Sequence, residues 1–199
     1  MFQRGHMRRA EDRSRLLESY YPDSQTGSPY KIYKDYKLTY LMTNILPQFI
    51  VTQGRDPWGG LETYLTETLV QQQNKELFII AGRDGQRSIF NSSGINISAP
   101  SHTWKVVLVL EPGQGVSDVT KNTIAFAVDI PNYSSTERVS PDNPGSPLFS
   151  GNWRDYVTSI HDLEAVTGYK LLSNIPSDIQ EWIEGNNNPD RPRSPAITF

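Results

Sequence analysis

Three runs of mainly apolar residues dominate the pattern of hydrophobic and polar positions along the chain. They cover residues 77–82, 104–111 and 124–132, and turns rich in Gly, Ser and Asp separate them. Runs of this length without strict alternation are typical of strands that are buried on both faces of a sheet. A further strand is predicted over residues 39–45, ahead of a turn at Pro47. The pattern therefore predicts a central sheet.

The longest predicted helix begins near residue 56. Asp56 is a suitable N-cap, and Pro57 fits the first helical position. The apolar face that follows at helical spacing consists of Trp58, Leu61, Leu65 and Leu69. Glu62 falls outside this apolar stripe, so we expect that the core does not need it. A phosphate group would also be stabilised near the N-terminus of this helix.

Two short helices are predicted near the end of the chain. The run from Ser159 to Asp162 resembles a capping arrangement, and the helix that it opens is expected to end at Gly168. A second helix is predicted over residues 176–184, ended by Gly185. Its side chains that face the core are expected to be Ile179, Trp182 and Ile183.

The segments between these elements are interpreted as loops of one domain. Residues 16–40 are rich in tyrosine and lysine and are interpreted as a packed loop; the alternative is a surface that stacks bases and follows a nucleic-acid backbone. Residues 133–152 are rich in Ser, Pro, Gly and Asn and predict a long loop. Residues 1–185 are expected to form one domain, and residues 186–199 a disordered tail.

Composition excludes several classes of protein. The 199 residues include no cysteine, which excludes a disulfide framework, a thiol nucleophile and a zinc–thiolate site. The longest apolar runs have the length of strands, so no transmembrane helix is predicted. A net charge of −3 argues against strong overall attraction to nucleic acid. Residues 1–15 are locally basic, however, and are either a solvated terminus or a positive rim beside a phosphate.

Three stretches carry candidate chemistry: residues 2–7 (Phe-Gln-Arg-Gly-His-Met), residues 41–48 and residues 56–62. Together they supply an arginine, a histidine, amide side chains and a carboxylate, which suits hydrolysis of a phosphodiester. A neutral imidazole takes a proton from water at physiological pH. An oxygen-bound divalent cation neutralises charge at the phosphate and at the leaving oxygen. The planar arginine side chain matches phosphate geometry.

These stretches resemble the DNA/RNA non-specific endonucleases, the ββα-metal (His-Me finger) nucleases related to mitochondrial endonuclease G. That family carries Asp-Arg-Gly-His, a Met-Thr-Asn-x-x-Pro-Gln strand and a Trp-x-x-Leu-Glu helix. The corresponding residues here are 3–6, 42–48 and 58–62, and further runs match in order over most of residues 2–184. The resemblance implies an α+β fold, with a central antiparallel sheet, a ββα-metal motif and short flanking helices.

The resemblance also implies a reaction, which is Mg²⁺-dependent, sequence-nonspecific hydrolysis of DNA and RNA, with Mn²⁺ as an alternative cation. His6 is implied to be the general base, Arg4 to bind phosphate, and Glu62 to orient a metal-bound water. Gln53 is the expected side-chain ligand of the metal, and Asn44 is expected to support the fold. The arginines expected to hold the phosphate backbone alongside Arg4 are Arg8, Arg9 and Arg13. His102 and His161 are interpreted as structural, and Asp12 with Arg13 as a structural pair.

Three residues depart from the family pattern. Gln3 stands in place of the motif aspartate, and Thr66 in place of an arginine one helical turn after the glutamate. Gly54 occupies the position of the metal-binding asparagine, with Gln53 one residue earlier. A displacement of about 1 Å is enough to cost roughly 10²-fold in rate. The alternative function is therefore a catalytically impaired fold that only binds nucleic acid or a protein partner. Hydrolysis of another phosphoester is a third interpretation.

Family members carry N-terminal strands and a further arginine ahead of Arg-Gly-His, so the endonuclease domain of residues 1–185 is expected to be N-terminally truncated. The resemblance implies a secreted or periplasmic location, although the first residues lack the pattern of a signal peptide. The oligomeric state is left open, with a dimer as one option, and no membrane partner is expected.

Overall fold

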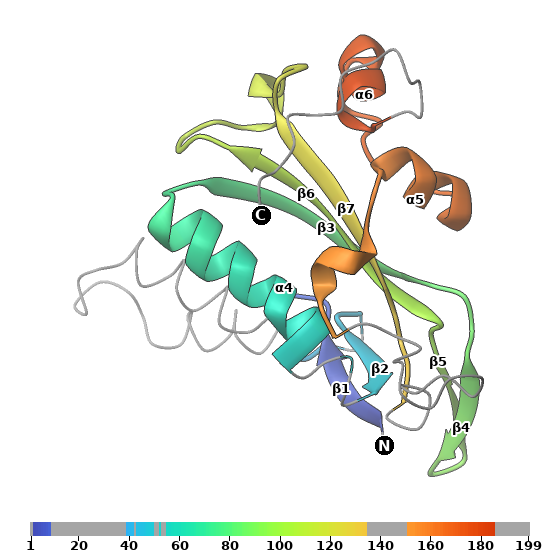
Figure 1. Ribbon diagram of the computed structural model, residues 1–199. Coiled ribbons are helices and arrows are strands. Elements are labelled where there is room, and N and C mark those ends of the chain that lie inside the picture. The colour runs from blue at the N-terminus through green and yellow to red at the C-terminus, as the bar shows by residue number, and fades with distance from the viewer. Residues whose placement is uncertain are drawn as a thin grey trace, which may run out of the picture.

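A four-stranded antiparallel sheet forms the centre of the protein. The computed structural model describes residues 2–8, 39–41, 43–49, 52, 55–134 and 151–185. The strand order in the sheet is β3–β6–β7–β8. The bounds of these strands are β3 Glu76–Asp84, β6 His102–Leu110, β7 Ile124–Pro131 and β8 Val157–Thr158. The predicted α+β fold with an antiparallel central sheet is confirmed, and its three main strands lie where they were predicted (Figure 1). The expectation of burial on both faces is confirmed for β6 and β7 and wrong for β3, which is an edge strand with Ile79 and Ile80 exposed.

A separate pair of antiparallel strands carries the Arg-Gly-His motif. Strand β1 (Phe2–His6) pairs with β2 (Ile45–Phe49), and His6 lies opposite Ile45 in the register. The predicted strand over residues 39–45 is wrong, because residues 39–41, 43 and 44 lie in turns or a bend and the strand begins at Ile45. Pro47, predicted as a turn, lies inside β2 opposite Arg4. A two-stranded sheet has no central strand, so a residue without an amide hydrogen is accommodated there.

A long helical stretch follows β2 and lies along one face of the central sheet (Figure 1). It consists of η1 (Arg55–Gly59), α4 (Gly60–Thr63) and η2 (Tyr64–Gln72), and its ends contain wide, π-type turns. Asp56 has an extended backbone, as expected of a residue just outside a helix, and is joined to Pro57 by a cis peptide bond. The predicted apolar face of this helix is buried. We call residues 57–72 the site helix.

A hairpin that the sequence did not predict extends beyond one end of the central sheet (Figure 1). Strand β4 (Ser88–Ser92) pairs with β5 (Ile95–Ala99) around the two-residue turn Ser93–Gly94. Both turn residues have positive φ angles, 52° and 81°, as expected of the tight turns that join adjacent antiparallel strands. The Ser-Gly dipeptide was therefore the signal in the sequence.

Two helices cover the opposite face of the central sheet. Helix α5 (Ile160–Thr167) begins after Ser159, whose Oγ accepts a hydrogen bond of 2.9 Å from the amide of Asp162. It ends at Gly168, which has a φ of 74°. Helix α6 (Ser177–Ile183) follows, and Gly185 next to it is also left-handed. Both predicted helices are confirmed. Two short 3₁₀ turns, η3 (Val116–Asp118) and η5 (Trp153–Tyr156), complete the described elements.

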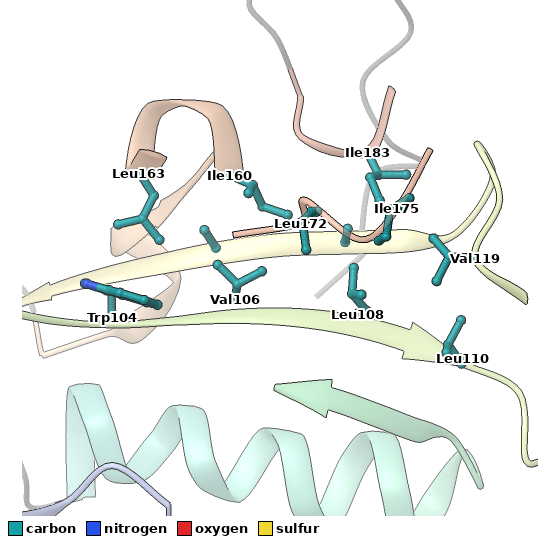
Figure 2. Packing of buried hydrophobic residues seen from close by; sticks show 12 residues of the cluster. Trp104, Val106, Leu108, Leu110, Val119, Ile160, Leu163, Leu172, Ile175 and Ile183 are labelled. Atoms are coloured by element: carbon teal, nitrogen blue, oxygen red, sulfur yellow. The ribbon is translucent and has the colours of Figure 1, made fainter. Parts of the chain in front are cut away.

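The core consists of two clusters, one on each face of the sheet, and β6 contributes to both. Trp104, Val106, Leu108 and Leu110 point toward the α5 side, where they meet Ile160, Leu163, Leu172, Ile175 and Ile183 (Figure 2). Val107 and Val109 point the other way, against the apolar face of the site helix. Lys105 lies on this second face by strand alternation. All but the first residue of β6 are buried.

Several predictions fall on residues outside the described ranges. These are most of the loop over residues 16–40, most of the loop over residues 133–152, and the tail over residues 186–199. Within the described ranges, no helix combines the length and the apolar character needed to cross a membrane.

Candidate active site

His6 is the last residue of β1 and is half-buried. Its Nε2 is enclosed, without a hydrogen-bond partner among the described residues. The ring of Tyr40 meets the imidazole edge-on, at 4.8 Å between ring centres. Burial lowers the pKa of His6 below its usual 6.5, and the charge of Arg4 lowers this pKa further. The imidazole is therefore neutral at physiological pH.

The glycine of the Arg-Gly-His motif is required by close packing. A Cβ atom at Gly5 would lie 1.8 Å from Oε1 of Gln48, which is far inside van der Waals contact. Gln48 is completely buried, and its Nε2 donates a hydrogen bond of 3.1 Å to Thr103 Oγ1 on β6. Gly5 thus lets β1 approach Gln48, and Gln48 links the strand pair to the central sheet.

Asn44 braces the turn before β2 through its side-chain amide. Its Oδ1 accepts a hydrogen bond from the amide of Arg8, and its Nδ2 donates to the carbonyl oxygens of Arg8 and Thr39. The backbone oxygen of Asn44 also accepts from the amide of Met7. These bonds hold the residues just after His6, in agreement with the expectation that Asn44 supports the fold.

Asn132, at the end of β7, ties β2 to the sheet from the other side. The buried Asn132 accepts a hydrogen bond of 2.8 Å from the amide of Phe49 and donates to the carbonyl oxygens of Pro47 and Pro100. Thr52 Oγ1 accepts a further bond from the amide of Tyr133. The position of β2, and hence of His6 opposite it, is fixed by bonds between residues that lie about 80 apart in the sequence.

Glu62 departs from the expectation that it lies outside the core. It is 7% exposed, and its Oε1 is 2.9 Å from Nζ of Lys105, which is 2% exposed. The same Nζ lies 4.5 Å from the centre of the Trp58 ring. Glu62 follows Trp58 by four residues, so the two side chains face the sheet together. Sequence reasoning missed Lys105, although a single lysine inside an apolar run was a signal for a buried ion pair.

The predicted phosphate-binding residues divide into two groups. Arg4 and Arg8 are described and exposed, and Arg4 lies on the same side of β1 as His6 because strand side chains alternate. Arg9, Arg13 and Gln53 lie outside the described residues, as does Asp12. The structure therefore brings Arg4 next to His6 and leaves the other predicted contacts as predictions.

The described residues alone do not fit a divalent cation. Within the described ranges, no three His, Asp or Glu side chains lie close enough together to hold one. The carboxylate of Glu62 already has one oxygen on Lys105. Gln53, the predicted side-chain ligand, lies outside the described residues.

His102 has a partner that the sequence did not reveal. Its Nδ1 is 2.9 Å from Oδ2 of Asp129 on the neighbouring strand. The hydrogen bond with Asp129 raises the pKa of His102, although burial acts in the opposite direction. Strand alternation places this pair on the α5 side of the sheet, away from Lys105. His161 lies in α5. Both placements agree with structural roles for these histidines.

Two strands and a helix thus hold a half-buried histidine, a neighbouring arginine and a buried glutamate, a combination that suits a hydrolase acting on phosphodiesters. The DNA/RNA non-specific endonuclease family model matches residues 1–178, and the chain belongs to this family. A curated protein named nuclease, from Nostoc sp. (strain PCC 7120 / SAG 25.82 / UTEX 2576), is 35% identical over 184 residues. The match covers 92% of this chain and 55% of that nuclease, so the chain spans about half the length of this relative.

Among solved structures, the chain is similar to one in the crystal structure of an EndoG/EndoGI complex, reported on the mechanism of EndoG inhibition. The TM-score is 0.48 and the sequence identity is 16%, and the match covers 88% of this chain and 60% of that one.

Proposed function

We propose that this chain is a sequence-nonspecific endonuclease that hydrolyses phosphodiester bonds in DNA and RNA with Mg²⁺, with His6 as the general base. The observation that carries the proposal is that His6, in a chain that belongs to this family, is a neutral imidazole at physiological pH. The imidazole is half-buried with a lowered pKa, so it is present as a base at neutral pH. General-base catalysis of this kind contributes roughly 10²–10⁴-fold to a rate.

In the proposed reaction the attacking water gives its proton to Nδ1 of His6. Nε2 is the enclosed nitrogen of the ring, which makes Nδ1 the nitrogen available to water. The contacts of Gly5, Gln48 and Asn44 hold the backbone on both sides of His6 before substrate binds, which limits the geometric freedom that would slow the step.

Arg4 is proposed to hold the phosphate next to this base. It is exposed, it lies on the same side of β1 as His6, and its charge already lowers the pKa of that imidazole. Arg8, Arg9 and Arg13 are proposed to bind neighbouring phosphates. Contacts to the backbone position a nucleic acid without reading its sequence, which supports a sequence-tolerant activity.

Mg²⁺, when bound, would neutralise charge on the phosphate and the leaving oxygen. Gln53 would supply a side-chain oxygen to the cation, and Glu62 would orient a water molecule at the site; the described residues by themselves do not complete such a site. The expected consequence is a site in which water and phosphate supply most of the ligands. A Gln53→Ala chain is therefore expected to need a higher Mg²⁺ concentration for half-maximal cleavage than the wild type.

The test is cleavage of supercoiled plasmid and of RNA by the purified chain with Mg²⁺, with EDTA, and as His6→Ala. We expect cleavage that both EDTA and His6→Ala abolish, while the matched control His161→Ala cleaves like the wild type. A folded wild-type chain that binds plasmid without cutting it would contradict the proposal. That result would favour the alternative, a fold that only binds nucleic acid. Cleavage of small chromogenic diesters but not of plasmid would favour another phosphoester substrate.

A further inference from the structure

A lysine in the middle of the central sheet is enclosed by two motif residues of the site helix. Nζ of Lys105 on β6 is 2.9 Å from Glu62 Oε1 and 4.5 Å from the centre of the Trp58 ring. Trp58 and Glu62 are four residues apart, so the helix presents both to the same point on the sheet. The Trp-x-x-Leu-Glu spacing thus places an aromatic ring and a carboxylate on two sides of a single ammonium group.

This ion pair is almost completely withdrawn from water. The side chain of Lys105 is 3% exposed and that of Glu62 is 8% exposed. The surrounding side chains on this face are apolar, among them Leu61, Leu65 and Val107. A carboxylate in water samples many orientations, whereas this one has an oxygen fixed by a cation that is itself held by a strand. The orientation of Glu62 is therefore set by β6 as well as by its own helix.

We propose that Lys105 is a positioning residue for the reaction: it holds the Glu62 carboxylate, from the sheet, in the orientation that serves the site. The inference rests on the function proposed above. Position 66, one helical turn after Glu62, is an arginine in the family pattern and an uncharged threonine in this chain. In this chain Lys105 places a positive charge directly on the Glu62 carboxylate. A lysine that only stabilised the fold would leave the chemical step unchanged.

The test compares Lys105→Met with a matched control elsewhere in the chain. Lys121 also contacts a carboxylate and a tryptophan, since its Nζ is 3.1 Å from Asp178 Oδ2 and 5.8 Å from the Trp182 ring centre. Both variants are assayed for plasmid cleavage with saturating Mg²⁺, per mole of folded protein and well below the unfolding temperature. We expect kcat to fall about 10²-fold in Lys105→Met, with KM nearly unchanged, and neither value to change in Lys121→Met.

A double-mutant cycle shows whether Lys105 acts through Glu62. We expect Lys105→Met/Glu62→Gln to have the same kcat as Glu62→Gln alone, because the carboxylate that Lys105 positions is already gone. The double variant removes both buried charges and leaves neither of them unpaired. The double variant can therefore be compared with Glu62→Gln even if Lys105→Met alone does not fold. A double variant that is slower than Glu62→Gln would overturn the inference, because Lys105 would then have an effect of its own.

A second readout does not depend on turnover. The ¹³C resonance of the Glu62 side-chain carboxylate, assigned with Glu62→Gln, is expected to shift in Lys105→Met and to stay in place in Lys121→Met. An unchanged resonance, or a fully active Lys105→Met chain, would overturn the inference while the proposed function stands. A wild-type chain that cleaves nothing would instead overturn the proposed function, and with it any role of Lys105 in a reaction. The shifted resonance would then show only a structural link between the two residues.

Discussion

Among the described residues, a lysine contacts a carboxylate and a tryptophan of one helix in two places, and the two sites differ chiefly in burial. In one, Trp58 and Glu62 of the site helix enclose Lys105. In the other, Asp178 and Trp182 of α6 contact Lys121, again at a spacing of four residues. The first pair is 3% and 8% exposed, and the second is 45% and 68% exposed. Similar contacts are thus buried next to the candidate site in one region and open to solvent in the other.

The difference teaches that the distance within an ion pair says little about what the pair does. The two N–O distances, 2.9 and 3.1 Å, are nearly equal. Solvent screens the exposed pair, whose net contribution is expected to be small. The buried pair is costly to form, and costlier still to break by removing one partner. The buried Lys105–Glu62 pair is therefore the one for which we propose a role other than stability.

The largest expected effect is the loss of stability when one buried partner is removed. Lys105→Met leaves Glu62 buried without its cation and is expected to lower the free energy of unfolding by ~3–5 kcal/mol. Lys121→Met is expected to lower it by about 0–1 kcal/mol, because that pair is exposed. Urea denaturation of both variants measures the contrast. Equal losses in the two variants would remove the distinction between the regions.

A second, somewhat smaller effect is expected at the glycine that lets β1 approach the sheet. Gly5→Ala places a methyl group on the buried amide of Gln48, and the overpacking is expected to cost about 1–3 kcal/mol. Gly115→Ala is the matched control, because a Cβ atom there has its nearest neighbour at 3.9 Å and the φ angle is −122°. Thermal unfolding followed by circular dichroism compares them. A Gly5→Ala chain as stable as the control would show that the contact with Gln48 is not tight.

Opposite pH dependences are expected at two histidines in different parts of the fold. The raised pKa of His102 adds stability that is fully present below pH 6.5 and is lost as the pH rises through the folded-state pKa above 6.5. The lowered pKa of His6 adds stability above pH 6.5 that is lost as the pH falls through a folded-state pKa below 6.5. The stability lost in His102→Gln should therefore shrink between pH 5.5 and pH 8. A loss that grows over this range would contradict the assignment of the ion pair.

The smallest expected effect is a difference in salt dependence between the Lys105–Glu62 and Lys121–Asp178 ion pairs. At 1 M ionic strength the screening length is about 3 Å, so the contribution of the exposed Lys121–Asp178 pair should disappear. The contribution of the buried Lys105–Glu62 pair should persist, because no ions reach it. Urea denaturation of wild type and both lysine variants at low and high NaCl measures this. A Lys105→Met effect as sensitive to salt as that of Lys121→Met would mean that water reaches the buried pair.

The elements that could be predicted from the sequence are those that depend on residues close to one another in the chain. Capping at Ser159, the left-handed Gly168 and the positions of β3, β6 and β7 all depend on neighbouring residues, and all were predicted correctly. The burial of β3 was not, because an apolar run does not reveal that its strand lies at an edge of the sheet. The error at β2 arose because Pro47 is a turn signal locally, whereas pairing with β1 makes it a strand residue. The hairpin at Ser93–Gly94 was overlooked although its turn signal was present.

The candidate site was predictable only as far as its motifs extend. The motifs single out His6, Arg4 and Glu62, but the residues that hold them are distant in the chain. Lys105 meets Glu62 across 43 residues, and Asn132 meets Phe49 across 83. Such contacts follow from which strands become neighbours in the sheet. No local pattern in the sequence contains that information.

The rate of plasmid cleavage as a function of pH tests the central claim, that His6 is the base, most directly. Burial and the charge of Arg4 lower the pKa of His6 below 6.5. Cleavage with saturating Mg²⁺ should therefore fall on acidification, as the imidazole takes up a proton, with a midpoint below pH 6.5. In an Arg4→Gln chain, the rate that remains should fall with a midpoint at a slightly higher pH than in the wild type, because the charge that lowers the pKa of His6 is gone. A rate that does not fall on acidification, or that falls with a midpoint above pH 6.5, would contradict the account.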